Sequence, residues 1–184
     1  MKSKGSLGTY WDFPSRYHGA AILEFNLPMI EVQKSILNAL YRLNGRSIGD
    51  YLKTLIGSNI NVIFEFGVAD GLVFNYIDGE ILKSLLDEVK KRTLHNLDVF
   101  CIIRYYALGK NGGSRPRALR FDYYFIRFLF RDSEVEVQVF HERGLQRISV
   151  EGLLKFLAER IGLEMAKGGD GAVKIKRLWT GLKP

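Results

Sequence analysis

The second half of the chain contains three long runs in which apolar and polar side chains alternate, at residues 97–108, 118–130 and 134–140. Alternation with a period of two predicts β-strands, because successive side chains of a strand point to opposite faces of a sheet. A glycine-rich loop at residues 109–116 and a short turn at residues 131–133 separate the runs, which predicts an antiparallel meander. Two of the runs exceed the usual strand length, so we expect a strongly twisted or curled sheet.

Three other stretches place apolar residues three and four positions apart, at residues 29–43, 81–89 and 150–165. This spacing predicts amphipathic helices, because it puts the apolar side chains on one face of a 3.6-residue turn. Asp78 and Ser149 stand just before the second and third stretches. Both residue types accept a hydrogen bond from the first helical turn, so we expect them to be N-caps.

The first half of the chain adds shorter elements. Residues 19–25 read as a first strand, and the runs at residues 60–66 and 72–77 read as a hairpin joined by a glycine-containing turn. Ser47 and Asp50 have the spacing of a capping box with Asp in place of Glu. That spacing predicts a short helix that opens at Ser47.

Together these elements predict an α+β protein with a mostly antiparallel, twisted sheet of about six strands and three or four helices packed mainly on one side. We expect residues 1–18 to form an extended N-terminal arm and residues 19–184 a single domain, with residues 172–179 as a possible edge strand. Two arrangements fit the order of the elements. One is a ferredoxin-like β-α-β-β-α-β start, and the other is a curved antiparallel sheet that grips the C-terminal helix.

Composition limits the class of protein. The chain has 184 residues, of which 47% are hydrophobic and one is cysteine, so a single domain with a full core is expected. A lone Cys101 can close no internal disulfide, which favours a reducing, cytoplasmic compartment. No run approaches the roughly 20 apolar residues that span a bilayer, so no membrane partner is expected. Scarce glutamine and threonine beside abundant Lys, Arg and Glu are typical of proteins from hot environments.

The formal net charge of +7 is concentrated in two segments. Residues 104–120 contain five basic side chains and no acidic one, and residues 167–184 carry a net charge of +4, so the other 149 residues carry −2. Localised positive charge is typical of a polyanion partner, because each cation placed on a phosphate releases counterions. The alternative interpretation is that lysine and arginine in a loop and a terminal strand serve solubility.

The two long strands beside the glycine-rich loop suggest a binding surface. Arg104 and Tyr106 share one face of the first strand, and Arg120 and Tyr124 share one face of the second. If the hairpin aligns these faces, tyrosine rings can stack on bases while the arginines follow phosphates. The predicted nucleic-acid-binding residues are Arg104, Tyr106, Lys110, Arg115, Arg117, Arg120, Tyr124, Lys174, Lys176 and Arg177. In the alternative interpretation, the tyrosines cover the sheet beneath a helix.

No pattern predicts a catalytic residue, a metal or a cofactor. His18, His95 and His141 are far apart in the sequence, and none belongs to a spacing that binds metal. Cys101 alternates with apolar neighbours and reads as a core residue. The glycine-rich loop lacks the order of glycines and Lys-Ser/Thr that a phosphate-binding P-loop needs, and a strand follows it.

The sequence leaves three functions open. The first is a non-catalytic protein that binds RNA or single-stranded DNA. The second is a structural or assembly protein, in which the aromatic strands or the arm with Trp11 and Phe13 form a homodimer or dock on a larger complex. The third is a small-molecule-binding domain or enzyme, with a pocket between the sheet and the C-terminal helix.

Overall fold

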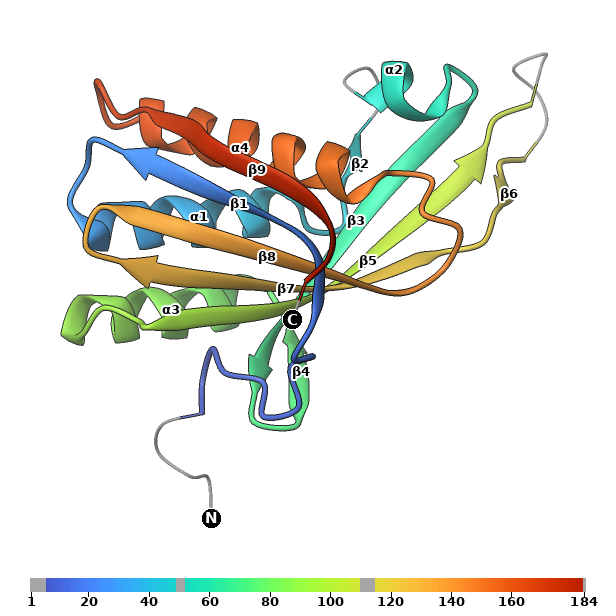
Figure 1. Ribbon diagram of the computed structural model, residues 1–184. Helices are drawn as coiled ribbons and strands as arrows, with labels where there is room; N and C mark the ends of the chain where they lie inside the picture. Colours follow the sequence, from blue (N-terminus) through green and yellow to red (C-terminus); the bar gives the residue numbers. More distant parts are fainter. Residues whose placement is uncertain (1–5, 49–51, 110–114, 184) are drawn as a thin grey trace.

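A computed structural model describes residues 6–48, 52–109 and 115–183. Within these residues the chain forms one nine-stranded sheet and four helices (Figure 1). The elements in chain order are β1 (Tyr17–Phe25), α1 (Met29–Leu43), β2 (Ser47–Ile48), α2 (Lys53–Ile56), β3 (Ile60–Asp70), β4 (Val73–Tyr76), α3 (Gly79–Lys91), β5 (Asn96–Ala107), β6 (Arg117–Ala118), β7 (Asp122–Arg131), β8 (Glu134–Arg143), α4 (Val150–Ala166) and β9 (Val173–Lys183). The predicted α+β class is confirmed.

The strands lie in the order β2-β3-β5-β7-β8-β1-β9, with β4 added to β3 and β6 added to β5. All these pairings are antiparallel. The predicted ferredoxin-like start is therefore wrong, because a βαβ unit requires parallel strands. Instead β1 pairs with the late strands β8 and β9. The expected number of about six strands was too low because β2 and β6 are short pairings, of two residues each, that no long alternating run announces.

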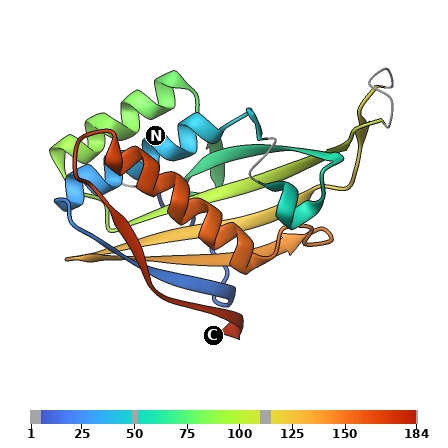
Figure 2. The same ribbon diagram turned by 90° about the horizontal axis from the view of Figure 1, so that it is seen from above.

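The helices α1, α3 and α4 lie on one face of the sheet (Figure 2). The side chains of β5 that point toward them are buried: Leu97, Val99, Cys101, Ile103 and Tyr105. Phe156 of α4 stacks on Phe64 of β3, with ring centroids 5.0 Å apart. Aromatic side chains thus fill the space between the sheet and α4 at this point.

Both predicted N-caps are confirmed. The Asp78 carboxylate accepts a hydrogen bond from the Ile81 amide at 2.9 Å, and the Ser149 hydroxyl accepts one from the Gly152 amide at 3.0 Å. Each cap satisfies a donor that the first turn of a helix leaves unpaired.

The predicted short helix does not begin at Ser47. Ser47 and Ile48 form strand β2 instead and pair with Ile63 and Val62 of β3. The Ser47 hydroxyl donates to the side chain of Asn61 on β3, so this serine supports strand pairing and does not cap a helix. Asp50, the other half of the expected capping box, lies outside the described residues.

The segment before β1 lies against the face of the sheet that the helices leave free. The Gly8 amide donates to the Ala69 carbonyl at 2.7 Å, and the Tyr10 ring stacks on Phe125 with centroids 5.4 Å apart. The Phe13 ring lies 4.0 Å from the guanidinium carbon of Arg127. The two ring contacts cover part of that face on β7, while the division into arm and domain stays a prediction.

Candidate nucleic-acid interface

The face of the sheet that points away from α1, α3 and α4 is called the open face here. On β5 it carries Phe100, Ile102, Arg104 and Tyr106, all half-buried. On β7 it carries Tyr123, which lies opposite Ile102 in the strand register. Aromatic and basic side chains therefore gather on a sheet surface that none of the described helices covers.

Arg104 lies over an aromatic ring. Its guanidinium carbon is 4.5 Å from the centroid of Phe121, and its Nε donates to the Glu65 carboxylate at 2.9 Å. The hydrogen bond to Glu65 raises the pKa of Arg104. The side chain keeps 31% of its surface exposed, so it can still take a second partner. Arg104 is thus a positioned cation on the open face.

Two more aromatic rings continue this surface. The Tyr123 ring stacks on Phe100 with centroids 5.7 Å apart and planes 10° apart, and it meets Phe121 edge-on at 6.4 Å. A cavity of about 390 Å³ opens beside these rings, and Arg120, Phe121, Tyr123, Arg143, Gly144 and Leu145 line it. Arg120 and Arg143 are exposed. We call Arg104, Arg120, Phe121, Tyr123 and Arg143 the open-face site.

The prediction that Tyr124 belongs to this surface is wrong. Tyr124 lies opposite Cys101 in the register, on the face that the helices cover, and it is fully buried. Its hydroxyl donates to the Ile148 carbonyl at 2.7 Å. Arg104 points to the other face of β5, so the hairpin cannot align these two residues.

The sequence predicted the wrong face of β7 because it grouped Tyr124 with the charged Arg120 by parity along the strand. Asp122 shares that parity, and both Asp122 and Tyr124 are buried. Two other residues of the strand indicate the correct orientation. The charged Arg127 lies on the same face as Tyr123, and the apolar Ile126 lies on the same face as Tyr124. Sequence reasoning missed Phe121 and Tyr123 for this reason. It also did not select Arg143, which ends β8.

The buried Asp122 carboxylate organises the segment that follows β8. It accepts hydrogen bonds from the Tyr105 hydroxyl at 2.6 Å and from the amides of Gln146 and Arg147 at 2.8 and 2.9 Å. Nε2 of His141 lies 3.4 Å from it. Burial, followed by the hydrogen bond to Asp122, raises the pKa of Tyr105 far above its ordinary value, so this phenol stays neutral and donates. We call these five residues the Asp122 cluster.

The Asp122 cluster also shapes the open-face site. Gly144 lines the site and has a φ of +116°, which L side chains rarely adopt. A Cβ added at Gly144 would lie 2.1 Å from an Asp122 carboxylate oxygen. Position 144, between the cluster and the cavity, can therefore be occupied only by glycine.

Four other predicted residues lie in or beside the glycine-rich loop. Tyr106 lies on the open face and pairs with Ala118 of β6. Arg115 and Arg117 are exposed, and Arg117 pairs with Ala107 at the end of β5. Lys110 lies outside the described residues.

The basic residues at the start of β9 lie at the other end of the sheet. Lys174 of β9 pairs with Glu24, Glu24 with Glu134, and Glu134 with Arg131. Arg131 ends β7 nine residues after Asp122, a distance of about 30 Å along an extended strand. Figure 1 shows the start of β9 on the left and β6 on the right, and Figure 2 shows the same separation. The structure does not bring Lys174, Lys176 and Arg177 to the open-face site.

Acidic neighbours also compensate part of the tail charge. Nζ of Lys176 lies 3.3 Å from the Glu24 carboxylate and forms a hydrogen bond with Glu134. The hydrogen bond with Glu134 raises the pKa of Lys176. The lysines on this edge strand fit the usual protection of an exposed sheet edge by charge.

Comparisons with known proteins gave no match. No protein-family model matches the chain, and no curated protein and no solved structure matches it either. The chemistry of the site itself is therefore the basis for a functional proposal.

Three further features of the described residues concern metal binding, thiol reactivity and membrane insertion. Residues 6–48, 52–109 and 115–183 contain no group of three or more His, Cys, Asp or Glu side chains that could hold a metal ion. Burial, followed by the neighbouring Asp122, raises the pKa of the Cys101 thiol well above its ordinary value, so little reactive thiolate forms. Among the same residues, no helix combines the length and apolar character that crossing a membrane requires.

Proposed function

We propose that this protein binds single-stranded nucleic acid, RNA or single-stranded DNA, at the open-face site. One observation carries the proposal: the half-buried rings of Phe121 and Tyr123 lie beside Arg104, Arg120 and Arg143 on the face that the described helices leave uncovered. Bases stack on aromatic rings in any sequence, while guanidinium groups contact the phosphates between them.

The charge around the site supports this partner. Arg115 and Arg117 are exposed on the segment that leads into β6, so they can extend a track of cations away from Arg120. The proposal leaves out the buried Tyr124 and the distant tail residues, which the sequence had included. A binding role without catalysis and a cytoplasmic location stay predictions, the latter supported by a single cysteine that is free and buried.

The direct test is fluorescence anisotropy with labelled oligonucleotides of mixed sequence at several salt concentrations. We expect binding that weakens as salt rises, with a slope of log K against log salt of about −2 if three arginines contact phosphates of a single strand. Double-stranded DNA of the same sequence is expected to bind more weakly, because its bases are not free to stack. Affinity that does not depend on salt would contradict the proposal.

Variants of the site separate stacking from charge. Tyr123→Ala is expected to reduce affinity between about 5-fold and 100-fold, the range for loss of one stacked base. Arg120→Ser, which removes an exposed side chain, is expected to weaken all sequences alike. Lys174→Ser is the matched control, since it removes an exposed cation at the far end of the sheet and should leave affinity unchanged at moderate salt. If Arg120→Ser and Lys174→Ser lose the same amount of oligonucleotide affinity, the attraction is nonspecific and the open-face site does not bind the strand.

A second candidate function is assembly, and a different observation favours it. Three large apolar side chains are exposed where the N-terminal segment meets the β3–β4 turn: Trp11 at 61%, Leu72 at 58% and Val73 at 57%. The Trp11 ring lies against Gly71 in that turn. Exposed aromatic and aliphatic groups that adjoin one another are typical of protein interfaces.

Light scattering on the purified protein tests the assembly function. If this patch is an interface between two copies, the wild type is a dimer and Leu72→Ser with Val73→Ser gives a monomer. Leu145→Ser is the control, because Leu145 is equally exposed but lies at the open-face site. A wild-type monomer at every concentration measured would contradict self-association through this patch.

A further inference from the structure

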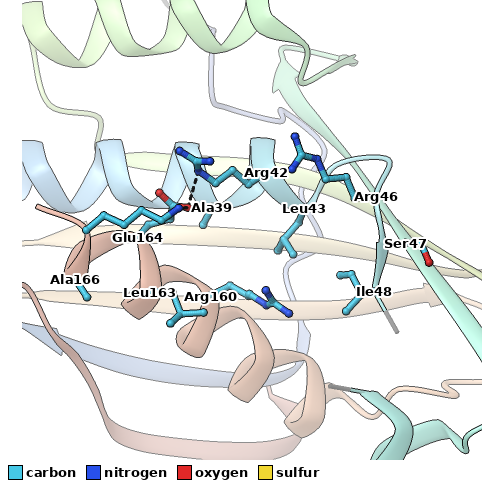
Figure 3. Close-up of a pocket in the computed structure, with 11 residues that line it drawn as sticks. Ala39, Arg42, Leu43, Arg46, Ser47, Ile48, Arg160, Leu163, Glu164 and Ala166 are labelled. Atoms are coloured by element: carbon cyan, nitrogen blue, oxygen red, sulfur yellow. Dashed lines mark hydrogen bonds and ion pairs between the residues drawn. The ribbon is translucent and has the colours of Figure 1, made fainter. Parts of the chain in front are cut away.

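A groove separates α1 and α4 on the helical side of the protein (Figure 3). Its cavity measures about 730 Å³, which lies within the range of small-molecule sites. The apolar part of the lining consists of Ala39, Leu43, Ile48, Leu163 and Ala166, and the charged part of Arg42, Arg46, Arg160, Lys167 and Glu164. This groove lies on the opposite side of the sheet from the open-face site.

Glu164 joins the two helices across the groove. Its carboxylate lies 2.8 Å from Nε of Arg42 on α1 and 2.7 Å from Nζ of Lys167, just after α4. Only 10% of the Glu164 side chain is exposed, whereas about half of each cation is. The carboxylate therefore holds the two cations in place while their outer surfaces stay open to a ligand.

The electrostatic balance of the lining favours an anion. Four basic side chains and one carboxylate line the groove, and that carboxylate contacts Arg42 and Lys167. Arg160 lies on the ring of Phe156, at 5.2 Å from its centroid, which orients the guanidinium group along α4. Planar guanidinium groups match phosphate oxygens in pairs, so arginines from both helices suit a phosphate group.

The apolar wall limits the kind of anion. Leu163 is 52% exposed in the groove, although it belongs to a helix whose other apolar residues are mostly buried. Ile48 and Leu43 line the opposite wall, where both are largely buried. An inorganic anion would leave the exposed surface of Leu163 in contact with water, whereas a ligand with an apolar ring would cover it.

We propose that the groove between α1 and α4 binds a small organophosphate of nucleotide size, with its phosphates on the arginines and its ring against Leu163. This ligand is separate from the nucleic acid proposed above, and its binding does not depend on the open-face site. A single cavity walled by two helices favours a small molecule over a long polymer, since the polymer needs an extended surface.

The test is isothermal titration calorimetry of the full chain with ATP as the probe, and with adenosine and inorganic tripolyphosphate as its two halves. We expect ATP to bind at one site per chain, and each half to bind at least about 10-fold more weakly. Arg46→Ser is expected to weaken ATP binding about 10-fold, the effect of one lost charged contact of about 1.4 kcal/mol. Arg92→Ser, just after α3, is the control and should leave ATP affinity unchanged.

A pair of charge variants at Leu163 tests the sign of the ligand. Both Leu163→Asp and Leu163→Lys remove the same apolar contact from an exposed position, so their difference reports charge alone. We expect Leu163→Lys to bind ATP more tightly than Leu163→Asp, by about 5-fold or more. Equal affinities of the two variants would overturn the proposal, as would absence of ATP binding to the wild type.

The proposals for the groove and for the open-face site can be contradicted independently of each other. Arg46→Ser should leave oligonucleotide binding intact, and Arg120→Ser should leave ATP binding intact. If Arg120→Ser removes ATP binding while Arg46→Ser does not, ATP occupies the open face and the groove proposal is wrong. If a glutamate-rich peptide binds in an Arg46-dependent manner and ATP does not, the groove takes an acidic peptide and the proposal is likewise wrong.

Discussion

Replacement of Asp122 by alanine is expected to lower the free energy of unfolding by about 4 kcal/mol. The substitution removes a buried acceptor and leaves the Tyr105 hydroxyl and the amides of Gln146 and Arg147 without their partner. Each unsatisfied buried donor costs about 1–3 kcal/mol, and the cavity adds to that cost. Urea denaturation followed by circular dichroism measures the change.

Two further variants make this result specific. Asp122→Asn keeps one acceptor oxygen and most of the volume, so we expect a smaller loss of about 2 kcal/mol. Asp132→Ala in the exposed turn between β7 and β8 is the matched control, with an expected change within about 0.5 kcal/mol. A loss below about 1 kcal/mol in Asp122→Ala would show that the cluster does not stabilise the fold. The nucleic-acid proposal also predicts weaker oligonucleotide binding by folded Asp122→Ala, because the segment that lines the site loses its anchor.

Asp98→Ala is expected to cost about 3 kcal/mol and to release the segment before β1. The buried Asp98 carboxylate binds Arg127 through two hydrogen bonds, of 2.6 and 2.7 Å, and accepts a third from the Tyr10 amide at 2.9 Å. Without Asp98, Arg127 becomes a half-buried cation that has lost its ion pair, and Tyr10 loses its amide partner. Denaturation measures the first effect, and the rate of trypsin cleavage after the exposed Arg16 measures the second.

The control for Asp98→Ala is Asp12→Ala, which removes an exposed carboxylate from the same segment. We expect Asp12→Ala to change neither stability nor the cleavage rate by a measurable amount. If Asp98→Ala lowers stability without faster cleavage after Arg16, other contacts hold the segment, such as the Tyr10 ring on Phe125.

Elements with a regular spacing of apolar residues could be predicted from the sequence. The helices α1, α3 and α4 follow from apolar spacing, and their caps at Asp78 and Ser149 follow from residue type. The prediction failed at Ser47, where the local capping signal was overridden by pairing with β3. Whether a serine caps a helix or supports a strand depends on a neighbour that is distant in the sequence, so no local pattern could decide it.

The candidate site was predictable in part. The sequence predicted aromatic and basic residues on β5 beside the loop, and the structure places Arg104 and Tyr106 on the open face. It selected Tyr124 in place of Tyr123, because Tyr124 shares the parity of the charged Arg120 and Asp122 along the strand. A buried carboxylate is possible only where several donors meet it, and those donors come from β5 and from the segment after β8.

By itself the sequence determined the α+β class, the antiparallel meander and the location of the positive charge along the chain, because these depend on residue types and short periods. Only the tertiary structure decided which face of β7 is buried, that β1 pairs with β8 and β9, and that Lys174, Lys176 and Arg177 lie far along the sheet from Arg104. Strand register and the burial of a polar group depend on partners far away in the sequence. Those partners meet only when the chain folds.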